Sequence, residues 1–393
     1  MNKALIITTV SGFLPQFEMN NVKLLQMNGY EVHYATNYNN PVYGNDNSML
    51  DNTGIFRHQI DFFRSPLRIA RHIKAYIQLK RLMNKYKFEL VHCHTPVGGV
   101  VGRLAAKSTG IGYILYTAHG FHFYSGASLI NWLLFYPAER ILAHFTDTLI
   151  TINHEDYNRA KKFHLRNDGK VEYIPGIGIN SENYDNNRIS KNDKLKELGI
   201  VTNTILFTSV GELSARKNHS VVIRAIAKVK KENLLYLICG SGSKEKELKK
   251  LVDKLGLENK VIFLGYRKDV KEILAITDIF IFPSIQEGLP VAMMEAMVAG
   301  KPIISSKIRG NTDLIQDGFG GYLVKPNDIN GYVRAIYNMM KCSKDDKKTM
   351  ANINMTNIKQ FDLEHVEEKM LSNYHIINNK YSGVISGNNS TVI

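Results

Sequence analysis

Short apolar segments alternate with amphipathic segments along most of the chain. The apolar segments have the length of buried β-strands, about four to eight residues, and the segments between them have helical spacing. Strands alternating with helices predict parallel sheets covered by helices on both faces. The strands are expected at 3–10, 31–36, 55–60, 90–94, 113–117, 148–152 and 171–174, and again at 204–210, 234–239, 261–264, 279–282 and 302–305.

A segment rich in Gly, Asn and Pro interrupts this alternation between the seventh and eighth strands. It reads as an interdomain linker, and 393 residues are enough for two domains with full cores. The fold class predicted is α/β, with two Rossmann-like domains facing across a cleft. The expected parts are an N-terminal domain at 1–175, the linker at 176–190, a C-terminal domain at 191–365, a C-terminal helix at 366–381 that can cross back to the first domain, and a disordered tail at 382–393.

Cysteine usage and hydropathy indicate the cellular compartment in which the protein is expected. The three cysteines, Cys93, Cys239 and Cys342, are odd in number and far apart, so a disulfide framework is not expected. A reducing cytoplasm is the simpler inference. The chain has no apolar run of about 18 residues or more, and residues 1–14 read as a first strand rather than a signal peptide.

The net charge is +14, and the segment at residues 64–87 is the most strongly basic part of the chain. Between residues 64 and 87 there is no acid, and apolar residues recur there at helical spacing. Such a basic amphipathic helix suits an anionic lipid surface, or it is a solvated helix face. The apolar run at 132–136 is read as a buried core helix or, alternatively, as a second membrane contact. The basic residues are Arg64, Arg68, Arg71, Lys74, Lys80, Arg81, Lys85 and Lys87.

The strongest chemical signal lies at 281–297, where an apolar strand runs into a loop and then a helix. The loop carries Glu287 and Gly288, Pro290 suits the first turn of the helix, and Glu295 follows within it. A helix N-terminus is a ready phosphate site, and open α/β sheets bind ligands at this edge. Two carboxylates around a bound phosphate would suit a sugar nucleotide. The alternative is a surface glutamate followed by an ordinary amphipathic helix.

Other predicted strands also end in residues suited to a ligand. Arg216 and Lys217 are adjacent cations that suit a diphosphate, or they are a solvated basic pair. Gly240 and Arg267 follow the next two strands of the same domain. In the first domain, Gly12 follows a strand as well, where it allows close approach of the backbone.

Histidines raise the question of a metal in the first domain. His119 ends a strand and could position a sugar hydroxyl, or it is a structural loop histidine. His92, Cys93 and His94 alternate along one strand, so Cys93 faces away from both histidines. No metal site is therefore expected.

Taken together, these residues resemble the retaining glycosyltransferases of family 4, which have the two-domain GT-B fold. The resemblance spans nearly the whole chain and is closest to members that assemble capsule, exopolysaccharide or lipid-linked repeat units. Its most specific part is the E-x7-E stretch from Glu287 to Glu295. Supporting segments are 117–120, 240–242 and 309–324.

The resemblance implies a role for each matching residue. Glu295 would hold the ribose hydroxyls, Glu287 would contact the donor sugar, and Lys217 with Arg216 would neutralise the leaving phosphate. The region of Arg267 would meet the base. Further donor contacts would come from Gly240 and from the backbone of Gly288, Leu289 and Val291, and His119 with the loop of Gly12 would complete the site from the acceptor domain. No cofactor and no divalent metal are implied.

Two positions depart from the family pattern. The family commonly has an arginine where this chain has Glu212, so phosphate binding must rely on Arg216 and Lys217. The N-terminal loop usually has paired glycines, whereas this chain reads Val10-Ser11-Gly12. Both departures bear on donor preference.

The function expected is transfer of a sugar, with retention, from a nucleotide diphosphate donor such as a UDP-sugar to a lipid-linked or polysaccharide acceptor. The protein would be cytoplasmic, associated peripherally with the inner face of the cell membrane, and would bind no nucleic acid. The alternatives are a UDP-sugar 2-epimerase of the same fold, which needs acid/base carboxylates in the first domain, and a non-catalytic polyanion-binding protein.

Overall fold

The computed structural model describes residues 2–42, 47–66, 68–181, 190–230 and 233–386, with residues 375–386 described by their backbone alone. The chain forms two compact units. Unit 1 comprises Met1–Gly178 together with Leu363–Ile393, and unit 2 comprises Ile179–Asp362.

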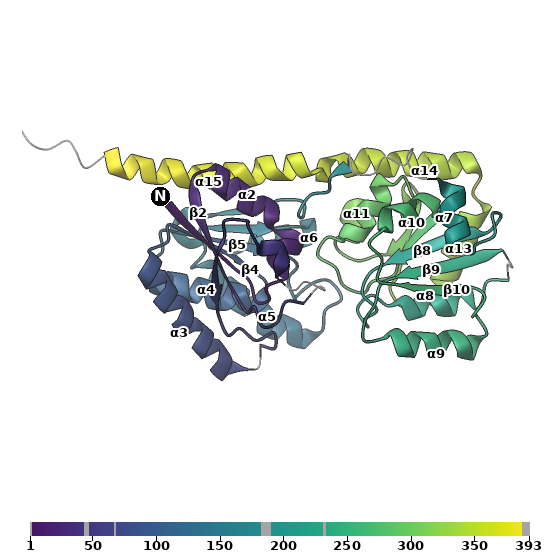
Figure 1. The fold of residues 1–393 in the computed structure, drawn as a ribbon, viewed down its shortest axis with the longest axis horizontal. Helices are drawn as coiled ribbons and strands as arrows, with labels where there is room; N and C mark the ends of the chain where they lie inside the picture. The colour runs from purple at the N-terminus through teal and green to yellow at the C-terminus, as the bar shows by residue number, and fades with distance from the viewer. Residues whose placement is uncertain (1, 43–46, 67, 182–189, 231–232, 387–393) are drawn as a thin grey trace, which may run out of the picture. The chain divides into compact units, whose positions relative to one another are not determined.

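Unit 1 is built on a seven-stranded parallel sheet in the order β3-β2-β1-β4-β5-β6-β7 (Figure 1). Its central strands are buried along almost their whole length, which explains their continuous apolar sequences. The strands are β1 (Asn2–Ile7), β2 (Tyr30–Thr36), β3 (Phe56–Gln59), β4 (Leu90–His94), β5 (Tyr113–Ala118), β6 (Thr148–Thr151) and β7 (Lys170–Tyr173).

Helices cover both faces of this sheet. One core cluster joins Leu79 and Val101 of two helices to the sheet, and the other joins Leu25 and Tyr374. The helices are α1 (Phe13–Phe17), α2 (Met19–Met27), α3 (Ile69–Tyr86), α4 (Pro96–Ser108), α5 (Leu129–Ala143), α6 (His154–Ala160) and the C-terminal α15 (Leu363–Ser386).

Unit 2 repeats the plan with a six-stranded parallel sheet in the order β10-β9-β8-β11-β12-β13. Its strands are β8 (Ile205–Val210), β9 (Leu234–Cys239), β10 (Val261–Gly265), β11 (Ile279–Phe282), β12 (Ile303–Ser306) and β13 (Gly321–Val324). Its helices are α7 (Lys191–Glu197), α8 (His219–Ile226), α9 (Glu245–Leu255), α10 (Val270–Ile276), α11 (Val291–Val298), α12 (Asn311–Leu314), α13 (Ile329–Lys341) and α14 (Lys344–Asn357).

The first helical segment of the chain, where residues 16–28 have helical spacing, is not a single helix. The chain forms α1 and α2, and Glu18 lies between them with φ −128° and ψ 9°, outside helical geometry. The first strand is also shorter than expected, because it ends at Ile7 and the chain then turns into α1. Glu18 therefore sits at a corner of the backbone, with its side chain buried.

The C-terminal part of the chain also differs from the sequence expectation. Ile179 bridges Asp362 at the boundary of unit 2, and α15 begins at Leu363, before the predicted residue 366. Val366 and Met370 join the core of unit 1, where α15 lies along α2 (Figure 1). Residues 382–386 continue this helix and are not the expected disordered tail. Much of the predicted linker, 182–189, and the tail residues 387–393 lie outside the described residues.

Candidate active site

In unit 2 the two neighbouring strands β8 and β11 bring their C-terminal loops together. The backbone N–H of Ile285 in the second loop donates to the carbonyl of Arg216 in the first, at 2.9 Å. This bond ties the loop of the adjacent cations to the loop that leads into α11. The structure thereby joins two segments that are about 70 residues apart in the sequence.

Three of the predicted site residues meet at this edge. Nζ of Lys217 and one guanidinium nitrogen of Arg216 both lie 2.8 Å from Oε1 of Glu287. The Lys217 and Glu287 side chains are 12% and 10% exposed, whereas Arg216 is 42% exposed. Nζ of Lys217 also lies 4.6 Å from the centre of the Phe282 ring. The cluster therefore has a buried lysine and a partly exposed arginine on one carboxylate.

Burial and charge oppose each other in this cluster. Burial alone would raise the pKa of Glu287, but Lys217 and Arg216 outweigh it and the pKa is lowered. Burial lowers the pKa of Lys217, although Glu287 and, more weakly, Glu212 act in the opposite direction. Glu287 is thus held as a carboxylate, and Glu212, the departure from the family pattern, acts on the charge of Lys217.

Two glycines, Gly211 and Gly240, allow the backbone to pack closely beside Lys217. Gly211 has φ +155°, and a Cβ there would lie 3.3 Å from Cε of Lys217. At Gly240, with φ +147°, a Cβ would lie 1.9 Å from the carbonyl oxygen of Gly211. No side chain fits at that distance, so Gly240 is required by loop packing. Its predicted role in donor binding rests on the resemblance alone.

The loop after Glu287 leads directly into α11. Nε of the buried Arg309 donates to the Glu287 carbonyl at 3.0 Å, which fixes the backbone ahead of Gly288. Leu289 is buried, and Pro290 is the N-cap of α11, one residue before the first turn predicted for it. Val291 then begins the helix, and Glu295 is its fifth residue, partly exposed. Backbone N–H groups at this helix start are the expected anion donors.

Arg267 lies at the end of β10, where it takes part in a different ion-pair group. Its guanidinium donates to Asp269 at 2.7 Å and to Glu197 at 2.9 Å, and Lys194 also binds Asp269 at 2.7 Å. Side-chain hydrogen bonds from Asp269 and Glu197 raise the pKa of Arg267 further. The guanidinium is committed to these acids, so the base contact predicted for this region would have to come from its backbone.

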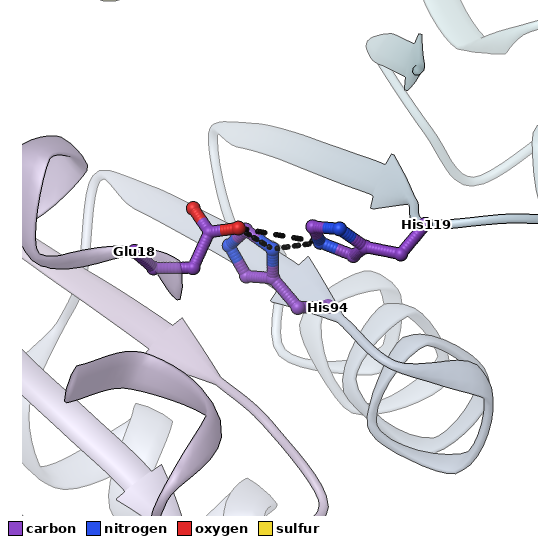
Figure 2. A group of neighbouring side chains, drawn as sticks. All are labelled: Glu18, His94 and His119. Atoms are coloured by element: carbon purple, nitrogen blue, oxygen red, sulfur yellow. Dashed lines mark hydrogen bonds and ion pairs between the residues drawn. The ribbon is translucent and has the colours of Figure 1, made fainter. Parts of the chain in front are cut away.

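In unit 1, three side chains point toward one another at the C-terminal ends of β4 and β5 (Figure 2). Oε1 of Glu18 lies 3.3 Å from Nε2 of His119 and 3.5 Å from Nδ1 of His94. Nδ1 of His94 lies 3.1 Å from Nε2 of His119. Glu18 and His94 are buried and His119 is 20% exposed. The sequence predicted a site role for His119 but none for Glu18.

Burial keeps these three side chains neutral near pH 7. It raises the pKa of Glu18 to about 8, against a hydrogen bond from Asn21 that lowers it. It lowers the pKa of His119 to about 4 and that of His94 well below its ordinary value. If Nδ1–H of His94 donates to Nε2 of His119, the remaining proton of His119 is on Nδ1. That nitrogen has no hydrogen-bond partner among the residues that the structure describes. Its N–H would therefore be available to donate a hydrogen bond to a ligand.

The same three side chains are the group that could hold a metal within the described part of the chain. Ligand atoms around a tetrahedral zinc lie about 3.3 Å apart, since each is about 2.05 Å from the ion. The three separations of 3.1, 3.3 and 3.5 Å are close to that value. His92 and Cys93, whose alternation predicted no metal site, do lie on opposite faces: His92 bonds Thr117 and Cys93 enters the core of α3 and α4. Glu18 had no predicted role, because it is far from both in the sequence.

Gly12 serves the local backbone of unit 1. It is the N-cap of α1, and a Cβ there would lie 2.2 Å from the carbonyl oxygen of Pro41 and 2.5 Å from that of Val42. The next residue, Phe13, packs edge-on against His119 with ring centres 4.9 Å apart. Gly12 thus lets its loop pack closely against the backbone of Pro41 and Val42. Phe13 then lies directly beside His119.

Known proteins share both units. Residues 190–355 match the family of glycosyl transferases group 1, and residues 4–153 match the family described as glycosyl transferase 4-like. The putative glycosyltransferase EpsD of Bacillus subtilis (strain 168) is 36% identical over 85% of this chain and 86% of its own length. The chain belongs to the family 4 glycosyltransferases. The two parallel-sheet units of this glycosyltransferase are those of the GT-B fold.

Further relatives cover most of this glycosyltransferase. An Escherichia coli UDP-Gal:alpha-D-GlcNAc-diphosphoundecaprenol alpha-1,3-galactosyltransferase is 33% identical over 69% of the chain and 71% of its own length. The structure of Anabaena HepE in complex with UDP and glucose aligns with a TM-score of 0.76 at 19% identity, covering 95% of this chain and 100% of that one. A glycosyltransferase from Rickettsia africae aligns with a TM-score of 0.76 at 19% identity, over 96% and 98%. These structures share the fold.

Proposed function

We propose that this glycosyltransferase moves a sugar from a UDP-sugar to a lipid-linked acceptor in the synthesis of a cell-surface polysaccharide, with retention at the anomeric carbon. The observation that carries the proposal is the cluster of Lys217, Arg216 and Glu287 beside the start of α11. Cations and helix N–H groups at one sheet edge suit a diphosphate. The Escherichia coli relative, named for a UDP-Gal donor and a diphosphoundecaprenol acceptor, supports the substrate classes.

The donor contacts follow from this placement. Lys217 and Arg216 bind the diphosphate, together with backbone N–H groups at Gly288, Leu289 and Val291. Glu295 holds the ribose hydroxyls from the first turns of α11, and the backbone near Arg267 meets the base. Glu287 contacts the donor sugar. Because Lys217 is already seated against Glu287, its charge needs little reorganisation when the phosphate leaves.

The reaction breaks the bond between the anomeric carbon and the diphosphate oxygen and forms a bond to an acceptor hydroxyl on the same face. The leaving diphosphate takes the proton of that hydroxyl. No protein base is therefore required, and the charge that develops on the phosphate is what Lys217 stabilises. His119, held in one tautomer by His94 and Glu18, donates a hydrogen bond to a sugar hydroxyl.

The protein acts without a metal in this proposal, since cations and helix N–H groups take the place of one. Glu18, His94 and His119 then form a mainly buried polar group in which the Glu18 carboxyl is neutral. The protein works in the cytoplasm at the inner face of the membrane, with the basic segment 64–87 against anionic lipid. Among the described residues no helix is long and apolar enough to cross a membrane.

A UDP-sugar 2-epimerase of the same fold is the second candidate, because Glu18 is one carboxyl group in the first domain, where such an enzyme needs acid/base carboxylates. Glu18 is buried beside two histidines, which is a suitable place for acid/base chemistry. The relatives described above, however, are glycosyltransferases, and the match to the putative glycosyltransferase EpsD extends over 85% of the chain. Transfer is therefore the better supported reaction.

The test is an incubation of the purified protein with a panel of nucleotide sugars, with and without a polyprenyl-diphosphate sugar acceptor. Mass spectrometry of the acceptor and nuclear magnetic resonance of the donor distinguish the candidates. An acceptor heavier by one sugar, with the donor's anomeric configuration kept, supports the proposal. Conversion of the donor to its 2-epimer without any acceptor would establish the epimerase instead.

A further inference from the structure

Unit 1 contains a cavity of about 830 Å³ that the donor chemistry does not use. It lies among α3, α4 and α5 and reaches the C-terminal ends of β1, β4 and β5. The volume is in the upper part of the range for ligand pockets, about 300–1,000 Å³. Its walls are mainly apolar, with side chains of Val10, Ile69, Ile73, Val97, Val100, Val101, Leu104, Phe121 and Phe135 among them.

The inner end of the cavity lies at the strand edge that carries His119. Gly120, the residue after His119, lines it, together with Thr9 and Thr95. The two threonine hydroxyls lie 2.8 Å from each other, and Thr9 also accepts from the N–H of Gly98 at 3.0 Å. These polar groups are already satisfied by one another, so the inner wall does not require a polar ligand.

One acid, Glu139, is part of the wall, and its charge is compensated within the protein. A nitrogen of the fully buried Arg103 lies 2.7 Å from Oε2 of Glu139, and the Tyr116 hydroxyl donates to Oε1 at 3.2 Å. The guanidinium of Arg103 stacks 3.8 Å from the centre of the Tyr116 ring. The wall therefore presents mainly apolar surface, together with His72, His122 and Glu139, whose charge Arg103 neutralises.

Exposed apolar lining residues on α3 and α4 mark the outer end of the cavity. Ile69 and Ile73 are 68% and 55% exposed, and Leu104 is 39% exposed. Arg64 and Lys107 stand at the same rim. Isoleucines exposed beside cations suit an anionic lipid surface, where apolar side chains enter the headgroup boundary.

The neighbouring helix α5 also carries exposed apolar side chains. In the 132–136 run, Trp132, Phe135 and Tyr136 pack against the core, but Leu133 and Leu134 are 75% and 59% exposed. The core interpretation of that run is confirmed for three of its side chains, whereas the membrane contact stays a prediction for the two exposed leucines. Further exposed apolar residues of this helix are Leu129, Ile130 and Ile141.

We infer that this cavity holds the apolar chain of a lipid-linked acceptor, running from the membrane at α3 and α4 toward the strand edge beside His119. The inference rests on the proposed function for the nature of the acceptor. Two features point to a lipid chain: the apolar walls lead from an exposed apolar and cationic rim, and the inner end lies next to a predicted site residue. With the lipid chain in the cavity, less of its apolar surface is exposed to water while the sugar reacts.

The test uses farnesyl phosphate, a short prenyl phosphate, as the probe, at concentrations below those at which it forms micelles. The single tryptophan of the chain, Trp132, packs one turn before the cavity residue Phe135 and reports binding by fluorescence. Val100→Phe fills the cavity, and Ile73→Gln makes its rim polar. The matched control is Ile77→Gln, since Ile77 is exposed on the same helix but does not line the cavity.

Wild type and Ile77→Gln are expected to bind farnesyl phosphate alike, and the two cavity variants at least tenfold more weakly. Excess inorganic phosphate should not displace the probe. No binding by wild type, equal binding by Val100→Phe and Ile73→Gln, or displacement by inorganic phosphate would each overturn the inference. Thermal melting confirms that each variant is folded.

A second measurement in the same samples separates this inference from the proposed function. UDP should raise the melting temperature of wild type and of all three variants, because its site is in unit 2. A UDP shift without farnesyl phosphate binding leaves the proposed function standing and overturns the lipid-chain cavity. Farnesyl phosphate binding without a UDP shift supports the cavity and counts against the proposed donor.

Discussion

The ammonium nitrogen of Lys217 lies 2.8 Å from Oε1 of Glu287, and both side chains are nearly buried. The pair sits where the loops after β8 and β11 meet, and Arg216 reaches the same oxygen from a more exposed position. A buried charge whose partner is removed is strongly destabilising. Each cation therefore holds Glu287, and in the proposed function each also binds the diphosphate.

Lys217→Ala is expected to lower turnover about a hundredfold, the typical loss when one preorganised charge donor is removed. Arg216→Ala should lower it less than about tenfold, because Arg216 is 42% exposed and solvent screens its charge. Steady-state transfer kinetics measure both. The two variants are matched, since each leaves one cation on Glu287, and equal losses would show that the cations share the task.

Glu18 predicts a pH-dependent stability. Burial raises its pKa from 4.5 to about 8, so the folded protein keeps a proton that the unfolded chain loses between those values. This group's contribution to the free energy of unfolding is thus fully present below pH 4.5 and is lost as the pH rises toward 8, with a slope of about 1.4 kcal/mol per pH unit.

Glu18→Gln isolates that contribution, because the amide imitates the neutral carboxyl and does not titrate. Urea unfolding of wild type and variant from pH 4 to 9 measures it. The stability of the variant relative to wild type should grow from pH 4.5 to 8 and then level off. A difference that is constant with pH would show that Glu18 is not held neutral.

Glu295→Ala is expected to weaken UDP binding about 10- to 150-fold, which corresponds to the loss of a charge-assisted hydrogen bond of about 1.5–3 kcal/mol. Calorimetric titration with UDP measures the affinity. Glu258→Ala, an exposed acid of the same unit, is the control and should bind as wild type does. Unchanged affinity in Glu295→Ala would refute the ribose contact.

The basic segment predicts salt-dependent membrane attachment. Cations near an anionic surface contribute about 1 kcal/mol each, screened within about 8 Å at physiological ionic strength. Changing four of them to Gln should abolish sedimentation with anionic liposomes, whereas the same charge change on α9 should not. The test set is Arg68, Arg71, Lys80 and Arg81, and the control set is Lys246, Lys249, Lys250 and Lys254. Equal sedimentation of the two variants would mean that α3 is only a solvated helix.

Much of the fold was predictable because its signals are local. A buried parallel strand is a continuous apolar run, as β11 (Ile279–Phe282) shows. Each such strand can therefore be located from its own segment of sequence. The α/β class and the glycosyltransferase family are confirmed by the sheets and by the relatives. Glu287 and Lys217 were both named from the sequence, but their contact depends on the pairing of β8 with β11.

The contribution of Glu18 could not be read from the sequence. It lies in a stretch with helical spacing, where a glutamate is ordinarily a solvated residue. Only the break between α1 and α2 turns its side chain toward His94 and His119. The cavity was equally hidden, because its walls come from three helices whose apolar residues look like ordinary core positions.

The most direct test of the account is hydrogen–deuterium exchange of the wild-type protein with and without UDP. The account predicts slower exchange at 211–217 and 286–295, since these loops and the start of α11 would hold the diphosphate and the ribose. It predicts the loss of that protection in Lys217→Ala at the same UDP concentration. Protection confined to other segments, or none at saturating UDP, would contradict the assignment of the donor site.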